Sequence, residues 1–110
     1  MKVLIFAISI FLVSSAFAED EVYRCVRELK IYQSFSNSDA AIACRGVEKA
    51  TEVHDCVRYL KIYQSFNNSD AANACQATLD SNIVTSCVSD LKIYQSFNNK
   101  DAAVACGRVR

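Results

Sequence analysis

The chain has 110 residues with 12 basic and 12 acidic side chains, so its formal net charge is zero. A neutral chain without a basic cluster argues against nucleic acid or an anionic membrane as a partner, because both attract clustered Lys and Arg. The absence of proline and the presence of only two glycines disfavour turn-rich all-β folds and favour helices.

Residues 1–18 have the pattern of a secretory signal peptide. Lys2 precedes a short apolar run, and Ala16 and Ala18 are small residues at the positions that a signal peptidase recognises. The apolar run is shorter than the roughly 20 residues that span a bilayer, although an uncleaved anchor is the alternative. We therefore predict a secreted or periplasmic protein, cleaved after Ala18 and free of the membrane, whose mature residues 19–110 form a single repeat domain.

One stretch of the mature chain occurs three times at a fixed interval of 31 residues. The copies read CVRELKIYQSFSNSDAAIAC, CVRYLKIYQSFNNSDAANAC and CVSDLKIYQSFNNKDAAVAC. Such a period is typical of repeat proteins, in which each unit buries its apolar face against its neighbours. The interval divides the domain into units of about 19–49, 50–80 and 81–110.

The first part of each unit has the apolar spacing of an amphipathic helix. In the first unit the apolar positions are Val22, Cys25, Val26, Leu29 and Tyr32, at i, i+3, i+4 and i+7 intervals. Good N-cap residues precede them and predict the helix starts: Asp20, Thr51 and Asn82. We expect these long helices at about 21–34, 52–65 and 83–96.

A polar turn and a short alanine-rich helix follow in each unit. The predicted caps of this second helix are Asn37, Asn68 and Asn99. An aspartate then falls in the first helical turn, where the helix dipole favours negative charge: Asp39, Asp70 and Asp101. In the first unit this helix spans about 38–46, with Gly46 as its C-terminal stop.

The six cysteines are expected to form one disulfide within each unit. Both cysteines of a unit lie about ten residues from the middle of the turn, so an antiparallel hairpin places them at similar heights. The predicted pairs are Cys25–Cys44, Cys56–Cys75 and Cys87–Cys106. A rival pattern joins neighbouring units through Cys44–Cys56 and Cys75–Cys87, and then requires Cys25–Cys106.

A second apolar pair in each unit suggests that the hairpins stack. Ile31 and Phe35 are four residues apart and lie off the face that contains the cysteine. The equivalent pairs are Ile62 with Phe66 and Ile93 with Phe97. We therefore expect an all-α fold of three disulfide-stapled hairpins, stacked as a short α-solenoid-like array. The alternative is that each phenylalanine only covers its own turn.

The sequence contains no pattern that indicates catalysis, a cofactor or a metal. The single histidine, His54, lies beside Asp55, but its position fits a helix surface better than a general base. The cysteine spacing differs from that of zinc sites, and disulfides explain every cysteine. Asn67 begins a glycosylation sequon on an expected turn.

The remaining candidate for function is a polar and aromatic surface repeated in every unit. Stacking in register would align the candidate binding residues in rows: Lys30, Gln33, Lys61, Tyr63, Gln64, Lys92 and Gln95. Such rows suit a protein or glycan partner, because repeat arrays bind along extended faces. The alternative function is structural or effector-like, as in a toxin, inhibitor or matrix component, and the rows are then a solvated surface copied by duplication.

Overall fold

The computed structural model describes residues 20–107, and the predicted signal peptide lies outside this range. Over the described residues the chain is all-helical, which confirms the predicted fold class. The helices are α1 over 20–33, α2 Asn37–Cys44, α3 Ala50–Tyr63, α4 Asn68–Cys75, α5 Ser81–Gln95 and α6 Asn99–Cys106. Within this range, no helix combines the length and the hydropathy that crossing a bilayer demands.

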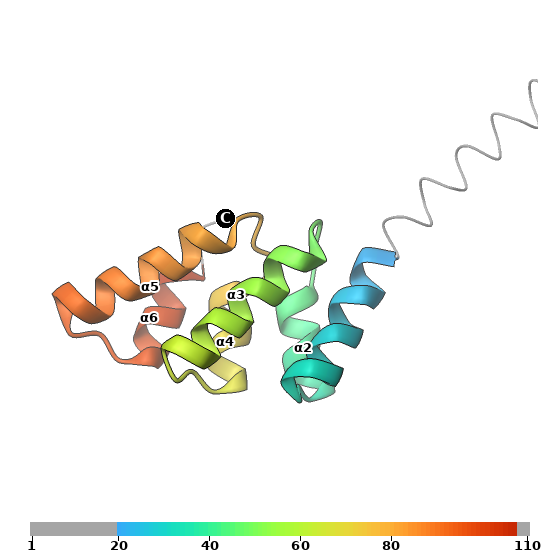
Figure 1. Cartoon of the computed structure of the whole chain (residues 1–110), viewed down its shortest axis with the longest axis horizontal. Coiled ribbons are helices and arrows are strands. Elements are labelled where there is room, and N and C mark those ends of the chain that lie inside the picture. The colour runs from blue at the N-terminus through green and yellow to red at the C-terminus, as the bar shows by residue number, and fades with distance from the viewer. Residues whose placement is uncertain (1–19, 108–110) are drawn as a thin grey trace, which may run out of the picture.

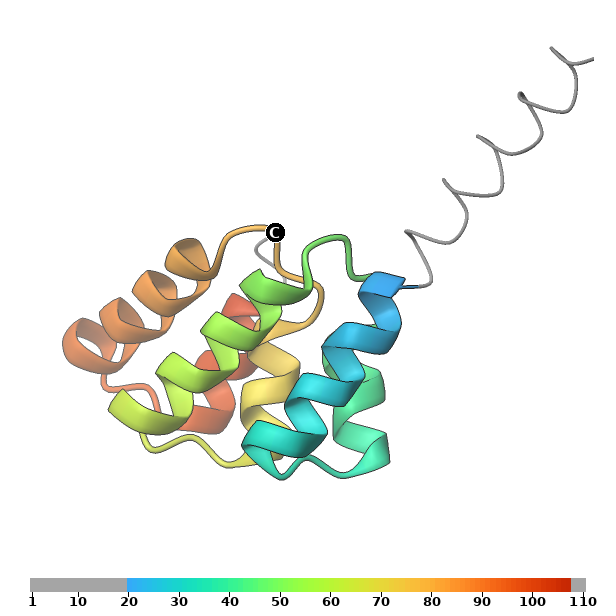
Figure 2. The same cartoon turned by 45° about the vertical axis from the view of Figure 1, so that its right-hand side comes forward.

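The three hairpins stack side by side in two layers. Figure 1 shows the long helix of each hairpin beside the short one, and Figure 2 shows α1, α3 and α5 following one another along one layer. The second layer contains α2, α4 and α6, of which α4 contacts both of the others. This arrangement confirms the expected α-solenoid-like array.

The disulfides are the predicted bridges within each unit. The Cα atoms of the three pairs lie 5.8, 5.7 and 5.9 Å apart, from the first unit to the third. Each cysteine is bonded to the other cysteine of its own unit, so the rival pattern between neighbouring units is excluded. Fully buried alanines such as Ala40 and Ala71 let the two backbones of a hairpin approach closely enough for this short link.

The stacking surface differs from the one that the sequence suggested. Phe35 and Phe66 are each 4% exposed, as expected for residues between units, but Ile31 is 63% exposed. Ile31 follows Leu29 by two residues, which is about 200° around a helix, so it points away from the core. The valines Val53 and Val57 of α3 are fully buried and fill the contact that we assigned to the isoleucines.

The short helices begin one residue earlier than predicted. Their N-caps are Ser36, Asn67 and Asn98. Each cap accepts a hydrogen bond from the aspartate amide three residues later, at 3.1, 2.8 and 2.8 Å. The predicted caps Asn68 and Asn99 instead donate to carbonyls of the preceding unit. The three aspartates lie in the first turn, as expected.

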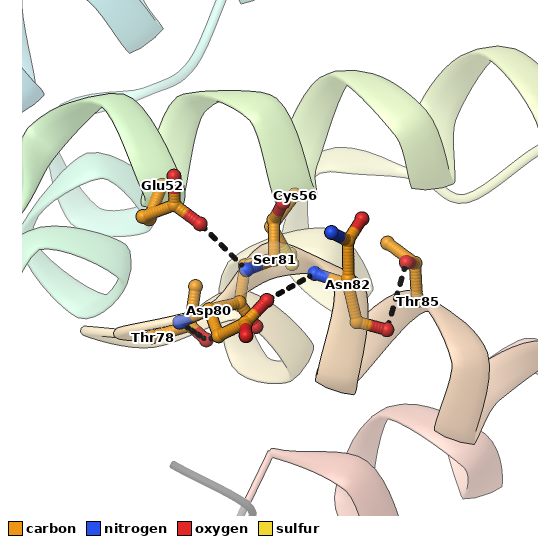
Figure 3. Close-up of a disulfide and its surroundings, with 8 residues drawn as sticks. Glu52, Cys56, Thr78, Asp80, Ser81, Asn82 and Thr85 are labelled. Atoms are coloured by element: carbon orange, nitrogen blue, oxygen red, sulfur yellow. Dashed lines mark hydrogen bonds between the residues drawn. A yellow bond between two sulfur atoms is a disulfide. The ribbon is translucent and has the colours of Figure 1, made fainter.

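The long helices also begin earlier than predicted, so Thr51 and Asn82 are not N-caps. Helix α3 starts at Ala50, whose amide donates to a carboxylate oxygen of Glu21 in the preceding unit at 2.8 Å. The amide of Ser81, at the start of α5, donates in the same way to Glu52 at 2.9 Å (Figure 3). A glutamate from the preceding unit therefore satisfies the first amide of each of these helices, and in α5 the local N-cap Asp80 also accepts from the Asn82 amide at 2.9 Å.

Left-handed residues follow helices α1 to α5. Ser34, Ser65 and Ser96 follow the long helices with φ of 56°, 57° and 57°. This conformation turns the next amide back, so the N–H of Phe97 donates to the carbonyl of Leu91 at 3.1 Å. Gly46 has φ 71° and stops α2, as predicted, although α2 itself ends at Cys44.

Candidate functional site

The recurring lysines hold neighbouring units together. The Lys61 ammonium donates to the backbone carbonyl of Gln33 at 2.8 Å, and the Lys92 ammonium donates to that of Gln64 at 3.1 Å. Each ammonium also lies 5.7 Å from the centre of a phenylalanine ring of the preceding unit. Partial burial lowers the pKa of the Lys61 ammonium below its usual value.

The other lysine and the glutamines of the predicted binding face lie in different environments. Lys30 belongs to the first unit and is exposed. Gln33 and Gln64 are half-buried, and the Gln64 side chain donates to the Ser89 hydroxyl of α5 at 3.0 Å. Gln95 is exposed. Of the lysine and glutamine rows, the side chains of Lys61, Gln64 and Lys92 make contacts between units.

Tyr63, the aromatic member of the predicted face, lies on the open surface of the long helices. Tyr32, Tyr63 and Tyr94 are 70%, 70% and 74% exposed. The preceding isoleucines Ile31, Ile62 and Ile93 are 63%, 58% and 68% exposed. These six residues, which we call the Ile–Tyr surface, recur on α1, α3 and α5, three helices that Figure 2 shows in succession.

The middle unit extends the Ile–Tyr surface into a depression on α3. This depression has a volume of about 370 Å³ and is lined by Asp55, Arg58, Tyr59, Ile62 and Tyr63. The rings of Tyr59 and Tyr63 are 4.9 Å apart at their centres. Its lining combines an isoleucine and two tyrosine rings with a carboxylate and a guanidinium, so it offers both apolar and charged contacts.

His54 lies between α1 and α3, at the edge of the same surface. Its ring meets that of Tyr32 edge to face, with the ring centres 6.1 Å apart. The Nε2 atom of His54 is buried and has no hydrogen-bond partner among the described residues. A second depression, of about 360 Å³, is lined by Tyr32, Gln33, His54 and Arg58. This pairing of neighbouring units was not foreseen, because Tyr32 and His54 belong to different repeats.

The isoleucines of the Ile–Tyr surface were also missed as candidate binding residues. Their outward position follows from the sequence once Leu29 is taken as the centre of the buried face, so the signal was present. Over residues 20–107, no group of three or more His, Cys, Asp or Glu side chains is arranged to hold a metal ion.

The repeated hairpins and internal bridges define the chain as a disulfide-stapled helical repeat protein. Comparison with protein-family models, curated proteins and solved structures finds no match.

Proposed function

We propose that this chain is an exported interaction module that binds a protein partner through the Ile–Tyr surface. The observation that carries this proposal is the threefold exposure of an isoleucine and a tyrosine on successive long helices. Contiguous exposed apolar side chains on a small protein commonly mark an interaction site. We assign no catalytic step to the protein.

The composition of the surface favours a protein over a glycan. Interfaces between proteins are enriched in tyrosine, and their apolar centres have polar rims. Here Ile62 and Tyr63 lie beside Asp55 and Arg58, which can supply such a rim. A glycan site needs several polar side chains that converge on sugar hydroxyls, whereas this surface exposes an isoleucine and a tyrosine on each of the three long helices.

The disulfides support export. Disulfide bridges persist in oxidising compartments, and a small domain with three of them is typical of extracellular or periplasmic proteins. The predicted signal peptide at residues 1–18 gives the route. A rigid array of this kind presents its repeated side chains with little loss of conformational entropy on binding.

Site-specific photo-crosslinking tests the proposal. A benzophenone amino acid replaces Tyr63 in the oxidised mature protein, which is then irradiated in the extracellular fluid of the source organism. The matched control carries the same group at Asn73, which is exposed on α4 in the other layer. We expect a crosslinked protein from position 63 and none from position 73, and loss of that crosslink when Tyr32→Ser and Tyr94→Ser are added.

Three outcomes would contradict binding of a protein partner. The same crosslinked proteins from both positions would indicate non-specific contact. Retention on a polysaccharide that depends on the tyrosines, without a protein crosslink, would favour a glycan ligand. Absence of both would favour the structural or effector-like role.

A further inference from the structure

The first unit exposes the apolar side chains that its successors bury against the preceding unit. Val22 is 42% exposed, whereas its equivalents Val53 and Val84 are fully buried. Ala41 is exposed, whereas Ala72 and Ala103 are 0% and 1% exposed. We call Val22, the half-buried Val26 and Ala41 the leading face of the stack.

The last unit exposes the complementary set. Phe97 is 36% exposed, whereas the two equivalent phenylalanines are 4% exposed. Ala105 is exposed, although Ala43 and Ala74 are 0% and 1% exposed, and Leu91 is only half-buried. We call Phe97, Ala105 and Leu91 the trailing face.

The same polar contacts occur at both internal junctions. Among the described residues, the first unit retains the donors of this contact without acceptors, and the last unit retains the acceptors without donors. At each junction a lysine and an asparagine of the later unit donate to carbonyls at the end of the earlier unit's long helix. On the leading face the same two residue types are Lys30 and Asn37, both exposed. On the trailing side the matching carbonyls belong to Gln95 and Ser96, also exposed.

Stable repeat arrays usually end in units whose outer faces are polar, because an unpartnered apolar face favours association. Within residues 20–107, neither end of this stack has such a cap. Each end instead retains the surface that, at two places within the same chain, is covered by its complement. The internal junctions therefore show directly what fits each face.

We propose that the protein associates head to tail, with the trailing face of one copy against the leading face of a second copy. The contact is heterologous, so each added copy presents a new free end and the assembly is open-ended. One internal contact has no counterpart: Ile83 occupies the position of Glu21 and Glu52, so no carboxylate meets the next helix start. The contact between copies is accordingly weaker than an internal junction, and assembly depends on protein concentration.

Two charge insertions test the faces separately. Ala41→Lys places an ammonium on the leading face and Ala105→Lys places one on the trailing face, and both alanines are exposed within the single chain. The matched control is Ser38→Lys, an exposed position whose equivalents Ser69 and Lys100 stay exposed at the two internal junctions. Far-UV circular dichroism melting checks that all three variants fold like the parent.

Sedimentation velocity of the oxidised mature chain, over a hundredfold range of concentration, gives the result. We expect the average mass of the parent and of Ser38→Lys to rise past that of a dimer. Either face variant alone is expected to stay near the monomer mass, since burying an unpaired ammonium weakens the association constant by about tenfold or more. A parent that remains monomeric throughout overturns the proposal.

Mixing the two face variants distinguishes head-to-tail contact from any symmetric dimer. Ala41→Lys retains a free trailing face and Ala105→Lys retains a free leading face, so the equimolar mixture is expected to form a dimer and nothing larger. A mixture that stays monomeric, or a parent that stops at a dimer, contradicts the geometry. Serine at Tyr32, Tyr63 and Tyr94 is expected to leave the association unchanged, which separates this contact from the Ile–Tyr surface.

Discussion

Removing the middle disulfide tests how this small domain obtains its stability. In Cys56→Ala/Cys75→Ala, α3 and α4 lose a bridge that spans 19 residues of sequence. Closing a loop of this length restricts the unfolded chain enough to contribute about 3 kcal/mol. Both sulfurs are also fully buried, and the void that they leave adds about 1 kcal/mol.

The double variant is therefore expected to lower the free energy of unfolding by about 4 kcal/mol. For a domain of this size that loss corresponds to a fall in Tm of about 15–30 °C. Urea unfolding of the oxidised mature protein, followed by circular dichroism at 222 nm, measures the free energy. A thiol assay confirms that the other two bridges remain closed.

The third unit provides the matched control. Cys87→Ala/Cys106→Ala opens a loop of the same length, but Cys87 is only half-buried, so we expect the smaller loss of about 3 kcal/mol. Parent-like unfolding midpoints in both double variants would refute the argument that each bridge stabilises the protein by restricting its unfolded chain. A larger loss in the third unit than in the middle unit would refute the contribution from burial.

Three further substitutions test the junctions, the helix ends and the caps by chemical denaturation. Lys61→Met removes the hydrogen bond to the backbone of α1 and is expected to cost about 1 kcal/mol, whereas Lys30→Met should cost almost nothing; equal losses would contradict a role in stacking. Ser65→Gly relieves a left-handed residue at φ 57° and should stabilise the protein by up to about 1 kcal/mol, so a loss of stability would show that the serine side chain matters more than the backbone. Asn67→Ala removes the N-cap of α4 and should lower the free energy of unfolding by about 1 kcal/mol. Asn73→Ala, on the exposed face of the same helix, should be neutral or slightly stabilising, and the reverse order would mean that the cap is unimportant.

The disulfide pairing and the hairpin fold could be predicted because both depend on short-range geometry. The equal distance of Cys25 and Cys44 from the turn determines their relative height in any antiparallel hairpin. Alanine-rich segments and the aspartates in the first turn then favour the second helix locally. These features act over fewer than about 20 residues, a range in which sequence spacing specifies spatial proximity.

The starts of the long helices could not be predicted correctly because a hydrogen-bond partner of the first amide comes from another unit, whereas the short-helix caps are local and were missed by one residue. The amide of Ala50 is satisfied by Glu21 and the side chain of Asn68 by the Ser34 carbonyl, at separations of 29 and 34 residues. A local rule assigns a cap to the nearest suitable side chain. Here the neighbouring unit provides an acceptor for the first amide, so the helix begins one or two residues earlier than the sequence predicted.

The roles of the repeated surface residues were the least predictable. Lys61, Ile62 and Tyr63 are consecutive and recur in every unit, and we predicted Lys61 and Tyr63 as binding residues but Ile62 as a stacking residue. In the fold, Lys61 lies at the junction with α1, whereas Ile62 and Tyr63 face solvent. Successive residues differ by about 100° around a helix. The buried face centred on Leu60 already directs Ile62 outward, but only the direction of approach of the neighbouring helix separates Lys61 from Tyr63.

The sequence by itself determined the helical hairpins, their number and their internal bridges, because period, composition and cysteine spacing constrain each unit independently of the others. Only the tertiary structure decided which side of each hairpin meets the next. That choice depends on the angle at which helices of different units pack, and it settles which identical side chains are buried in the middle of the stack and exposed at its ends.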